Sequence, residues 1–138
     1  MTDAQRTPTS IDLIADAWVD TVAELSPGTA TYIGRFEHND RLDDLSPEGT
    51  ERSLAATKAT IAALEAAAPV DGVDEVTKAD LLGELGVAVE LHDAHSHLRD
   101  LNVIASPAQD VRSVFDLMPT STVDDWEVVA RRLGAVPA

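Results

Sequence analysis

Apolar residues recur every three to four positions along most of this chain, with polar residues between them. That spacing is typical of an amphipathic α-helix, and no stretch of useful length alternates with the period of two that marks a half-buried strand. Start and stop signals divide the pattern into helices over about 10–25, 27–33, 47–68, 74–100, 107–118 and 122–134. The sequence therefore predicts an all-α fold, an irregular antiparallel bundle of five or six helices. Residues 1–9 are expected to form a loose tail and 35–44 an ordered loop, so that the helical domain covers 10–138.

Most of these helix boundaries are predicted from the residues at the helix starts. Serine followed by proline occurs at Ser26, Ser46 and Ser106, and proline is favoured at the first helical position after a capping serine. Ser106 and Gln109 also have the spacing of a capping box. Ser10 is predicted to cap the first helix, and Ser121 or Thr122 the last.

The faces of the helices predict which side chains are buried. The first helix has an apolar face opposite an acidic row at a spacing of four, and the last helix has one apolar face. The 74–100 helix is apolar on much of its circumference, which is typical of a central helix. A closed bundle would bury both tryptophans. The faces are Ile11, Ile14, Trp18, Val22 and Leu25, against Asp12, Asp16, Asp20 and Glu24, in the first helix, and Val123, Trp126, Ala130 and Leu133 in the last.

Charge narrows the possible partners. The 138 residues carry 25 acidic and 10 basic side chains, a net charge of −15. Nucleic-acid binding needs clustered lysine and arginine, and docking on anionic lipid needs a basic patch, so neither partner is expected. The chain has no cysteine, no basic-then-apolar leader and no apolar run of membrane-spanning length. A soluble protein of the cytoplasm is the expectation.

Three of the four histidines lie within six residues. His92 and His95 share a helical face, whereas His97 is expected to point away from His92. The pair could hold a metal, but no carboxylate on that face completes the ligand set that a catalytic zinc requires. His92 as a core histidine and all three as surface histidines remain the alternatives.

Two further places offer polar side chains for a substrate cleft. His38 and Arg41 lie with acidic neighbours in the 35–44 loop, where they could bind a substrate or shuttle a proton, or simply form salt bridges. Asn102 and Ser106 flank the turn after the long helix, where a terminating asparagine and a capping serine are the favoured explanation and a place in the cleft is the alternative. No catalytic residue is predicted, since the sequence contains no phosphate-binding loop, nucleophile elbow or His-Glu-x-x-His.

Four segments in this order and spacing, 30–34, 40–48, 99–107 and 126–137, resemble the N-terminal region of the bacterial family called domain of unknown function 885. Members of that family resemble mainly helical zinc metallopeptidases and are several times longer than this chain. The resemblance implies that these helices wall a substrate cleft. It also implies that the zinc-binding His-Glu-x-x-His of a full-length relative lies downstream of the matching region, so that zinc is expected there and no cofactor in residues 1–138.

Two functions from different classes follow. In the first, the chain is the truncated N-terminal segment of a metallopeptidase-like hydrolase, inactive alone, whose partner is the remainder of the full-length chain and whose full-length form takes a peptide substrate. In the second, it is a stand-alone acidic helical module that binds an unknown partner, or a second copy of itself, through exposed apolar surface.

Overall fold

The computed structural model describes residues 6–136, and every regular element within that range is a helix. Six are α-helices and two are short 3₁₀ helices, which confirms the predicted all-α, bundle-like fold. Within this range no helix is both long and apolar enough to cross a membrane. Residues 1–5 of the predicted tail, and residues 137–138, lie outside the described range. The elements are α1 (Ser10–Leu25), α2 (Pro27–Tyr32), α3 (Pro47–Ala66), α4 (Gly72–Asp93), η1 (Ser96–Arg99), α5 (Pro107–Ser113), η2 (Val114–Leu117) and α6 (Val123–Gly134).

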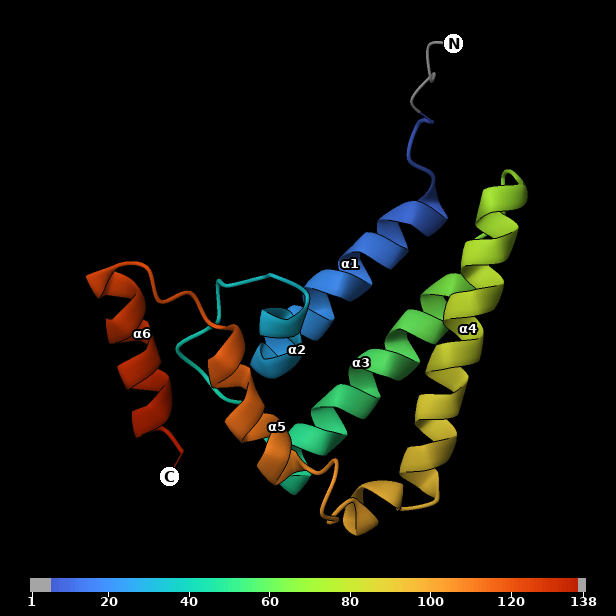
Figure 1. Cartoon of the computed structure of the whole chain (residues 1–138). Coiled ribbons are helices and arrows are strands. Elements are labelled where there is room, and N and C mark those ends of the chain that lie inside the picture. The colour runs from blue at the N-terminus through green and yellow to red at the C-terminus, as the bar shows by residue number, and fades with distance from the viewer. Residues whose placement is uncertain (1–5, 137–138) are drawn as a thin grey trace.

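Helices α1, α3 and α4 pack side by side, with α3 antiparallel to the other two (Figure 1). Their core is Ile11, Leu64 and Leu85, one buried side chain from each helix. Trp18 packs against this cluster and is partly buried. The apolar face predicted for the first helix therefore does face the core.

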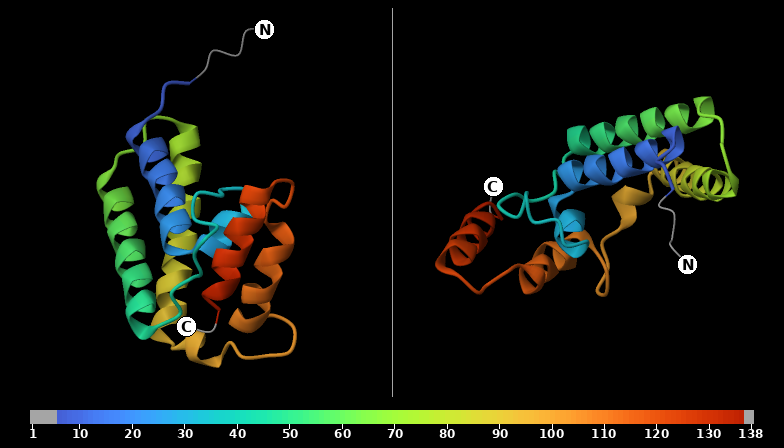
Figure 2. Two further views of the ribbon diagram at one scale, coloured as in Figure 1. Left: turned by 90° about the vertical axis from the view of Figure 1, so that its left-hand side faces the viewer. Right: turned by 90° about the horizontal axis from the view of Figure 1, so that it is seen from above.

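Helices α2, α5, η2 and α6 form a second, smaller part on the other side of α1 (Figure 2), while η1 contacts α4. Helix α2 contacts both α1 and η2, and η2 continues directly from α5. Helix α6 lies at the end of the molecule opposite α4 (Figure 1), and no helix packs against it as closely as α3 packs against α4.

Most helix starts form as predicted. The Ser26 hydroxyl accepts from the Thr29 amide and the Ser46 hydroxyl from the Gly49 amide. Thr122, one of the two residues predicted to cap the last helix, forms a capping box with Asp125. Gly34 ends the second helix region with φ +79, a conformation that glycine adopts without strain.

Two predicted caps are wrong. Thr9 rather than Ser10 caps α1. Thr9 forms a capping box with Asp12, whose carboxylate accepts a hydrogen bond from the Thr9 amide. Ser106 makes no side-chain cap: its hydroxyl bonds to the side-chain oxygen of Gln109 and not to a helix amide.

The long helix predicted over 74–100 is also wrong in extent and position. It begins at Gly72, capped by Asp71, and ends at Asp93, since His95 takes the left-handed conformation with φ 54. The helix is not central either. One apolar side of α4 packs on α3 and α1, and a second side, which carries Val76 and Leu91, is exposed.

Helix α6 is rotated from its predicted orientation. The face predicted to be buried is exposed: Trp126 is 57% exposed, and Val123 and Leu133 are more so. Instead the opposite side of the helix turns inward and carries Arg132, which is fully buried. A closed bundle would bury both tryptophans, and the exposure of Trp126 shows that α6 does not complete such a bundle.

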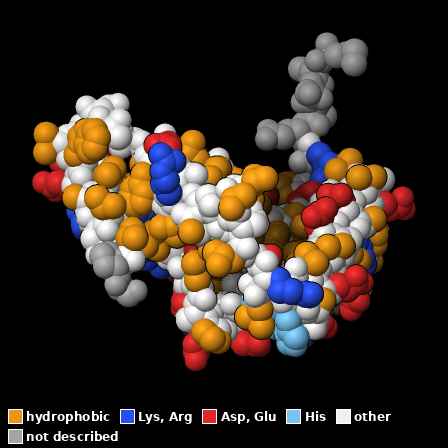
Figure 3. Space-filling model, turned by 60° about the horizontal axis from the view of Figure 1, so that its bottom comes forward, with side chains coloured by type: hydrophobic (Ala, Val, Ile, Leu, Met, Phe, Trp, Pro, Cys, Tyr) orange, Lys and Arg blue, Asp and Glu red, His pale blue; other side chains and the backbone are white. Residues whose placement is uncertain are grey.

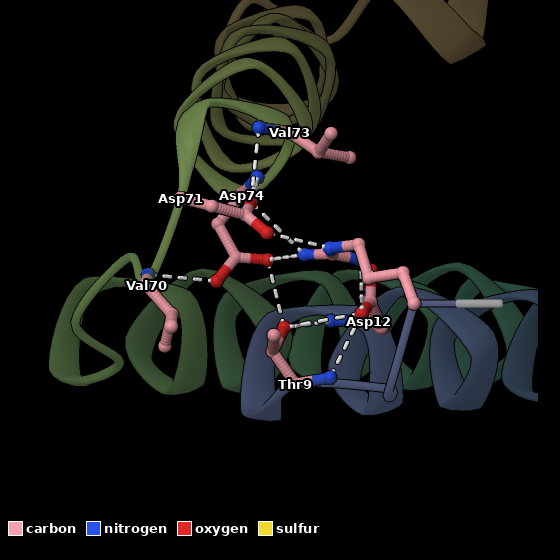
Figure 4. A network of polar contacts seen from close by, with 7 residues as sticks. Thr9, Asp12, Val70, Asp71, Val73 and Asp74 are labelled. Carbon is pink, nitrogen blue, oxygen red and sulfur yellow. Dashed lines mark hydrogen bonds and ion pairs between the residues drawn. The ribbon is translucent and has the colours of Figure 1, made fainter. Parts of the chain in front are cut away.

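A network of ion pairs and hydrogen bonds joins the start of α1 to the turn between α3 and α4 (Figure 4). Arg6 bonds to Asp12, Asp71 and Asp74. Asp74 is fully buried, and it also accepts from the Thr9 hydroxyl at 2.7 Å and from the Val70 amide at 2.8 Å. Hydrogen bonds from Arg6 lower the pKa of Asp12 and hold the pKa of Asp71 at about 2. Every buried charge in this network therefore has a partner.

Candidate functional site

The two polar loop residues predicted as cleft candidates meet on one carboxylate. His38 Nε2 lies 3.0 Å from Glu24 Oε2, and Arg41 Nη1 donates to Glu24 Oε1 at 3.0 Å. The bond from Arg41 lowers the pKa of Glu24. Glu24 belongs to the predicted acidic row of the first helix and is exposed, so this cluster is a surface ion-pair group that ties the 35–44 loop to α1.

Asn102 and Ser106 lie in a different part of the molecule, at the turn between η1 and α5. The Asn102 Oδ1 accepts from the amides of Ile104 and Ala105 at 2.9 and 2.8 Å, which closes the turn. Asn102 does not terminate the long helix, which ends nine residues earlier at Asp93. Within residues 6–136 no ion pair or side-chain hydrogen bond joins this turn to the His38–Arg41 cluster. The structure therefore brings His38 and Arg41 together on Glu24 and places Asn102 and Ser106 together in a separate turn, and a role of the four in a substrate cleft stays a prediction.

The histidine cluster differs from its predicted arrangement. The rings of His92 and His97 stack with centroids 5.1 Å apart, and His95 meets His97 edge-on at 6.3 Å. His97 comes back over His92 because the helix ends between them. His92 Nε2 is 3.4 Å from Glu51 Oε1 on α3. Within the described range no group of three or more histidine and carboxylate side chains is placed to hold a metal ion.

A cavity of about 280 Å³ lies between α2, the loop after it, α5 and α6. Its wall is mostly apolar and includes Tyr32, Leu45 and Val114. Three charged side chains also line it: Asp43, Asp110 and Arg132. Arg132 is the single cation among these lining residues.

Arg132 is 0% exposed and incompletely bonded. Its Nη1 donates to the Thr31 hydroxyl at 2.8 Å, and that hydroxyl is 2.7 Å from Asn39 Oδ1, so both polar side chains serve to hold the guanidinium. Its Nε and Nη2 are buried without any hydrogen-bond partner. Burial lowers the pKa of Arg132, and the nearby charges of Asp43 and Asp40 oppose that shift. Each unmade hydrogen bond of a buried donor costs roughly 1–3 kcal/mol.

Asp43 faces the cavity but is already engaged. Its Oδ2 accepts from the Ser26 hydroxyl at 2.7 Å and its Oδ1 from the Gly28 amide at 2.6 Å. These bonds fix the carboxylate over the start of α2 and keep it off the guanidinium of Arg132. Each oxygen retains one free lone pair, since a carboxylate oxygen accepts two hydrogen bonds.

Sequence reasoning missed this site. Arg132 is in the last turn of α6, where a cation beside the carbonyl end of a helix is ordinary and predicts an exposed side chain. The one available signal was that Val128 and Arg132, four residues apart, share a helical face that does not include Trp126. The competing face is larger and more apolar, so the pattern favoured it.

Comparison with known families matches the model described as "Bacterial protein of unknown function (DUF885)" to residues 27–138. The chain belongs to this family. The match confirms the family resemblance seen in the sequence, and it covers α2 to α6, including the whole of the Arg132 cavity. A search of curated proteins finds no match.

Proposed function

We propose that this DUF885 chain is the N-terminal helical part of a larger zinc metallopeptidase-like hydrolase, in which it walls the substrate cleft. The single observation that carries the proposal is family membership over 27–138. Residues 1–138 contain no His-Glu-x-x-His. The zinc ligands and the catalytic glutamate would therefore come from outside these residues, and this part would be inactive alone.

Exposed apolar surface supports a role beside further protein. The turn between η1 and α5 presents Leu101, Val103 and Ile104, which are 86%, 91% and 85% exposed. Figure 3 shows hydrophobic side chains spread over the face that includes this end of the molecule. Single exposed apolar residues are ordinary, but neighbouring ones mark a contact surface. In the proposal the rest of the hydrolase covers them.

The second candidate, a stand-alone acidic module, draws on the same surface. In that case Leu101, Val103 and Ile104 bind a separate partner or a second copy of the chain, and no zinc chemistry follows. The net charge of −15 favours a partner with a basic rim around the apolar contact.

The mass of the native product in its own cell separates the two candidates, measured by immunoblot and intact mass spectrometry. The hydrolase proposal predicts a product several times the 14.7 kDa of this chain, with bound zinc and activity on peptides. A native product of 14.7 kDa would contradict it and favour the module.

Zinc titration of the 138-residue chain by calorimetry tests whether these residues bind zinc without the rest of the proposed hydrolase. No stoichiometric site is expected, because within the described range no three histidine or carboxylate side chains are placed together to hold a metal ion. A tight one-to-one site that His92→Ala abolishes and His38→Ala leaves intact would overturn the assignment of zinc to another part of the protein.

A further inference from the structure

The unpartnered edge of Arg132 has the geometry of a carboxylate receptor. Nε and Nη2 are adjacent on the guanidinium, and their N–H bonds point the same way, so together they form one side of the planar fork. A carboxylate meets that side with two parallel hydrogen bonds, one to each oxygen. The opposite corner, Nη1, is held by Thr31, which fixes the plane of the fork.

No carboxylate of the described chain fills this edge. Asp43 lines the cavity, but its two oxygens already accept hydrogen bonds from Ser26 and Gly28. Within residues 6–136, Arg132 forms no ion pair within 4.0 Å, whereas the other buried charge, Asp74, has Arg6. The guanidinium is also shielded from water, which leaves the two N–H groups without solvent to bond.

The two carboxylates of the cavity wall indicate which second charged group a ligand would carry. Asp43 and Asp110 outnumber the single cation Arg132, so a simple anion would meet two carboxylates in the same cavity. A ligand that also carries an ammonium group offsets those charges. The apolar wall, with Val111 and Val114, suits an apolar side chain that branches from the backbone carrying the two charged groups.

We propose that this cavity binds a small zwitterion with an apolar body, an amino acid or a dipeptide. The carboxylate bonds to Nε and Nη2 of Arg132, and the ammonium lies toward Asp43 and Asp110. The volume of about 280 Å³ is just below that of drug-sized pockets, in keeping with a small ligand. Because Nε and Nη2 are shielded from water, a ligand reaches them only when side chains of the cavity wall move. Tyr32 and Leu45 line the cavity and are more than half exposed, so they can rotate without unpacking the core. This inference does not depend on the hydrolase proposal.

Calorimetric titration of the 138-residue chain tests the site with L-leucine and L-leucyl-L-leucine as probes. Saturable binding of either one is expected, and the tighter of the two identifies the source of the zwitterion. N-acetyl-L-leucine, which lacks the ammonium, and 3-methylbutylamine, which lacks the carboxylate, should both bind at least about tenfold more weakly, since each leaves one end of the site unpaired. Equal binding of L-leucine and N-acetyl-L-leucine would remove the ammonium half of the proposal, and no binding of either probe would overturn it entirely.

Matched variants assign the binding to the named side chains. Arg132→Lys keeps the charge but loses the fork and should weaken binding roughly tenfold or more, whereas Arg131→Gln alters an exposed neighbour outside the cavity and should leave it unchanged. If Arg132→Lys fails to fold, Asp110→Asn serves, because Asp110 is exposed on α5; its control is Asp116→Asn on η2. Asp110→Asn should weaken the binding of L-leucine more than the binding of N-acetyl-L-leucine, because only L-leucine carries the ammonium group. Equal effects of Asp110→Asn and Asp116→Asn would contradict the assignment.

Discussion

At the α1–α4 end of the molecule Arg6 lies among three carboxylates, whereas at the α6 end the more deeply buried Arg132 bonds to none. Both arginines join segments far apart in the chain, Arg6 to Asp74 and Arg132 to Thr31. In the first region every buried charge is compensated, which is what a structural anchor requires. In the second, two donors are left unpaired, and such exceptions are typical of binding sites. The four predictions below test this difference.

The largest expected effect comes from removing the centre of the paired network. Asp74→Ala leaves the Thr9 hydroxyl and the Val70 amide without an acceptor and removes a partner of Arg6. We expect the free energy of unfolding to fall by roughly 3 kcal/mol, measured by urea denaturation. Asp80→Ala, an exposed aspartate on the same helix, is the matched control and should change little. A loss below that of a surface substitution would show that the network is not an anchor.

The two tryptophans compare the packing of the same two regions. Trp18 packs against the Ile11–Leu64–Leu85 core, and Trp126 is 57% exposed on α6. Trp18→Ala should cost about 2–3 kcal/mol, somewhat less than a fully buried tryptophan, and Trp126→Ala less than about 1 kcal/mol. Acrylamide should quench Trp126 fluorescence more strongly than Trp18 fluorescence in the corresponding single-tryptophan variants. Equal costs would mean that α6 is packed as tightly as α1.

Removing the unpaired charge of Arg132 should raise the free energy of unfolding, whereas Asp74→Ala should lower it. Arg132→Met keeps an apolar stem of similar length and removes the buried cation with its two unbonded donors. Because an uncompensated buried charge is costly, we expect the ligand-free protein to become more stable by about 1 kcal/mol in urea denaturation. Arg6→Met should instead destabilise it. A marked loss of stability in Arg132→Met would mean that the bond to Thr31 outweighs the burial cost.

Acid should weaken the paired region through Asp71, whose pKa of about 2 lies below its ordinary 3.8. A carboxylate with a lowered folded-state pKa contributes stability that is present above its ordinary pKa and is lost as pH falls toward the folded value. Stability should therefore decline between about pH 4 and pH 2. Asp71→Asn should make that decline shallower in urea midpoints measured across this range. Asp44, whose pKa is also about 2 through bonds from Ser46 and Arg52, contributes to the remainder.

The sequence predicted the parts of the fold that depend on local chemistry. Serine–proline starts and Gly34 placed α2 and α3 to within about two residues, because capping and backbone preferences act between near neighbours. The end of α4 could not be predicted in this way, since nothing in the residues around His95 signals its left-handed conformation. The orientation of α6 depends on tertiary contacts with Thr31, about a hundred positions earlier in the chain.

The candidate sites show the same division. The surface pairs of His38 and Arg41 with Glu24 agree with the salt-bridge alternative that the sequence left open, whereas Asn102 closes a turn instead of terminating the long helix and Ser106 makes no side-chain cap. Their possible role in a full-length cleft stays a prediction, as does metal binding by His92 and His95. The Arg132 cavity could not be predicted, because it joins side chains from α2, the following loop, α5 and α6.

The most direct test of the unpaired Arg132 edge is urea denaturation of the wild-type chain and of Arg132→Met, each with and without saturating L-leucine. A ligand that binds only the folded state stabilises it in proportion to the logarithm of its concentration over its Kd. The account predicts that L-leucine raises the denaturation midpoint of the wild type and leaves that of Arg132→Met unchanged. A rise in both proteins, or in neither, would contradict it.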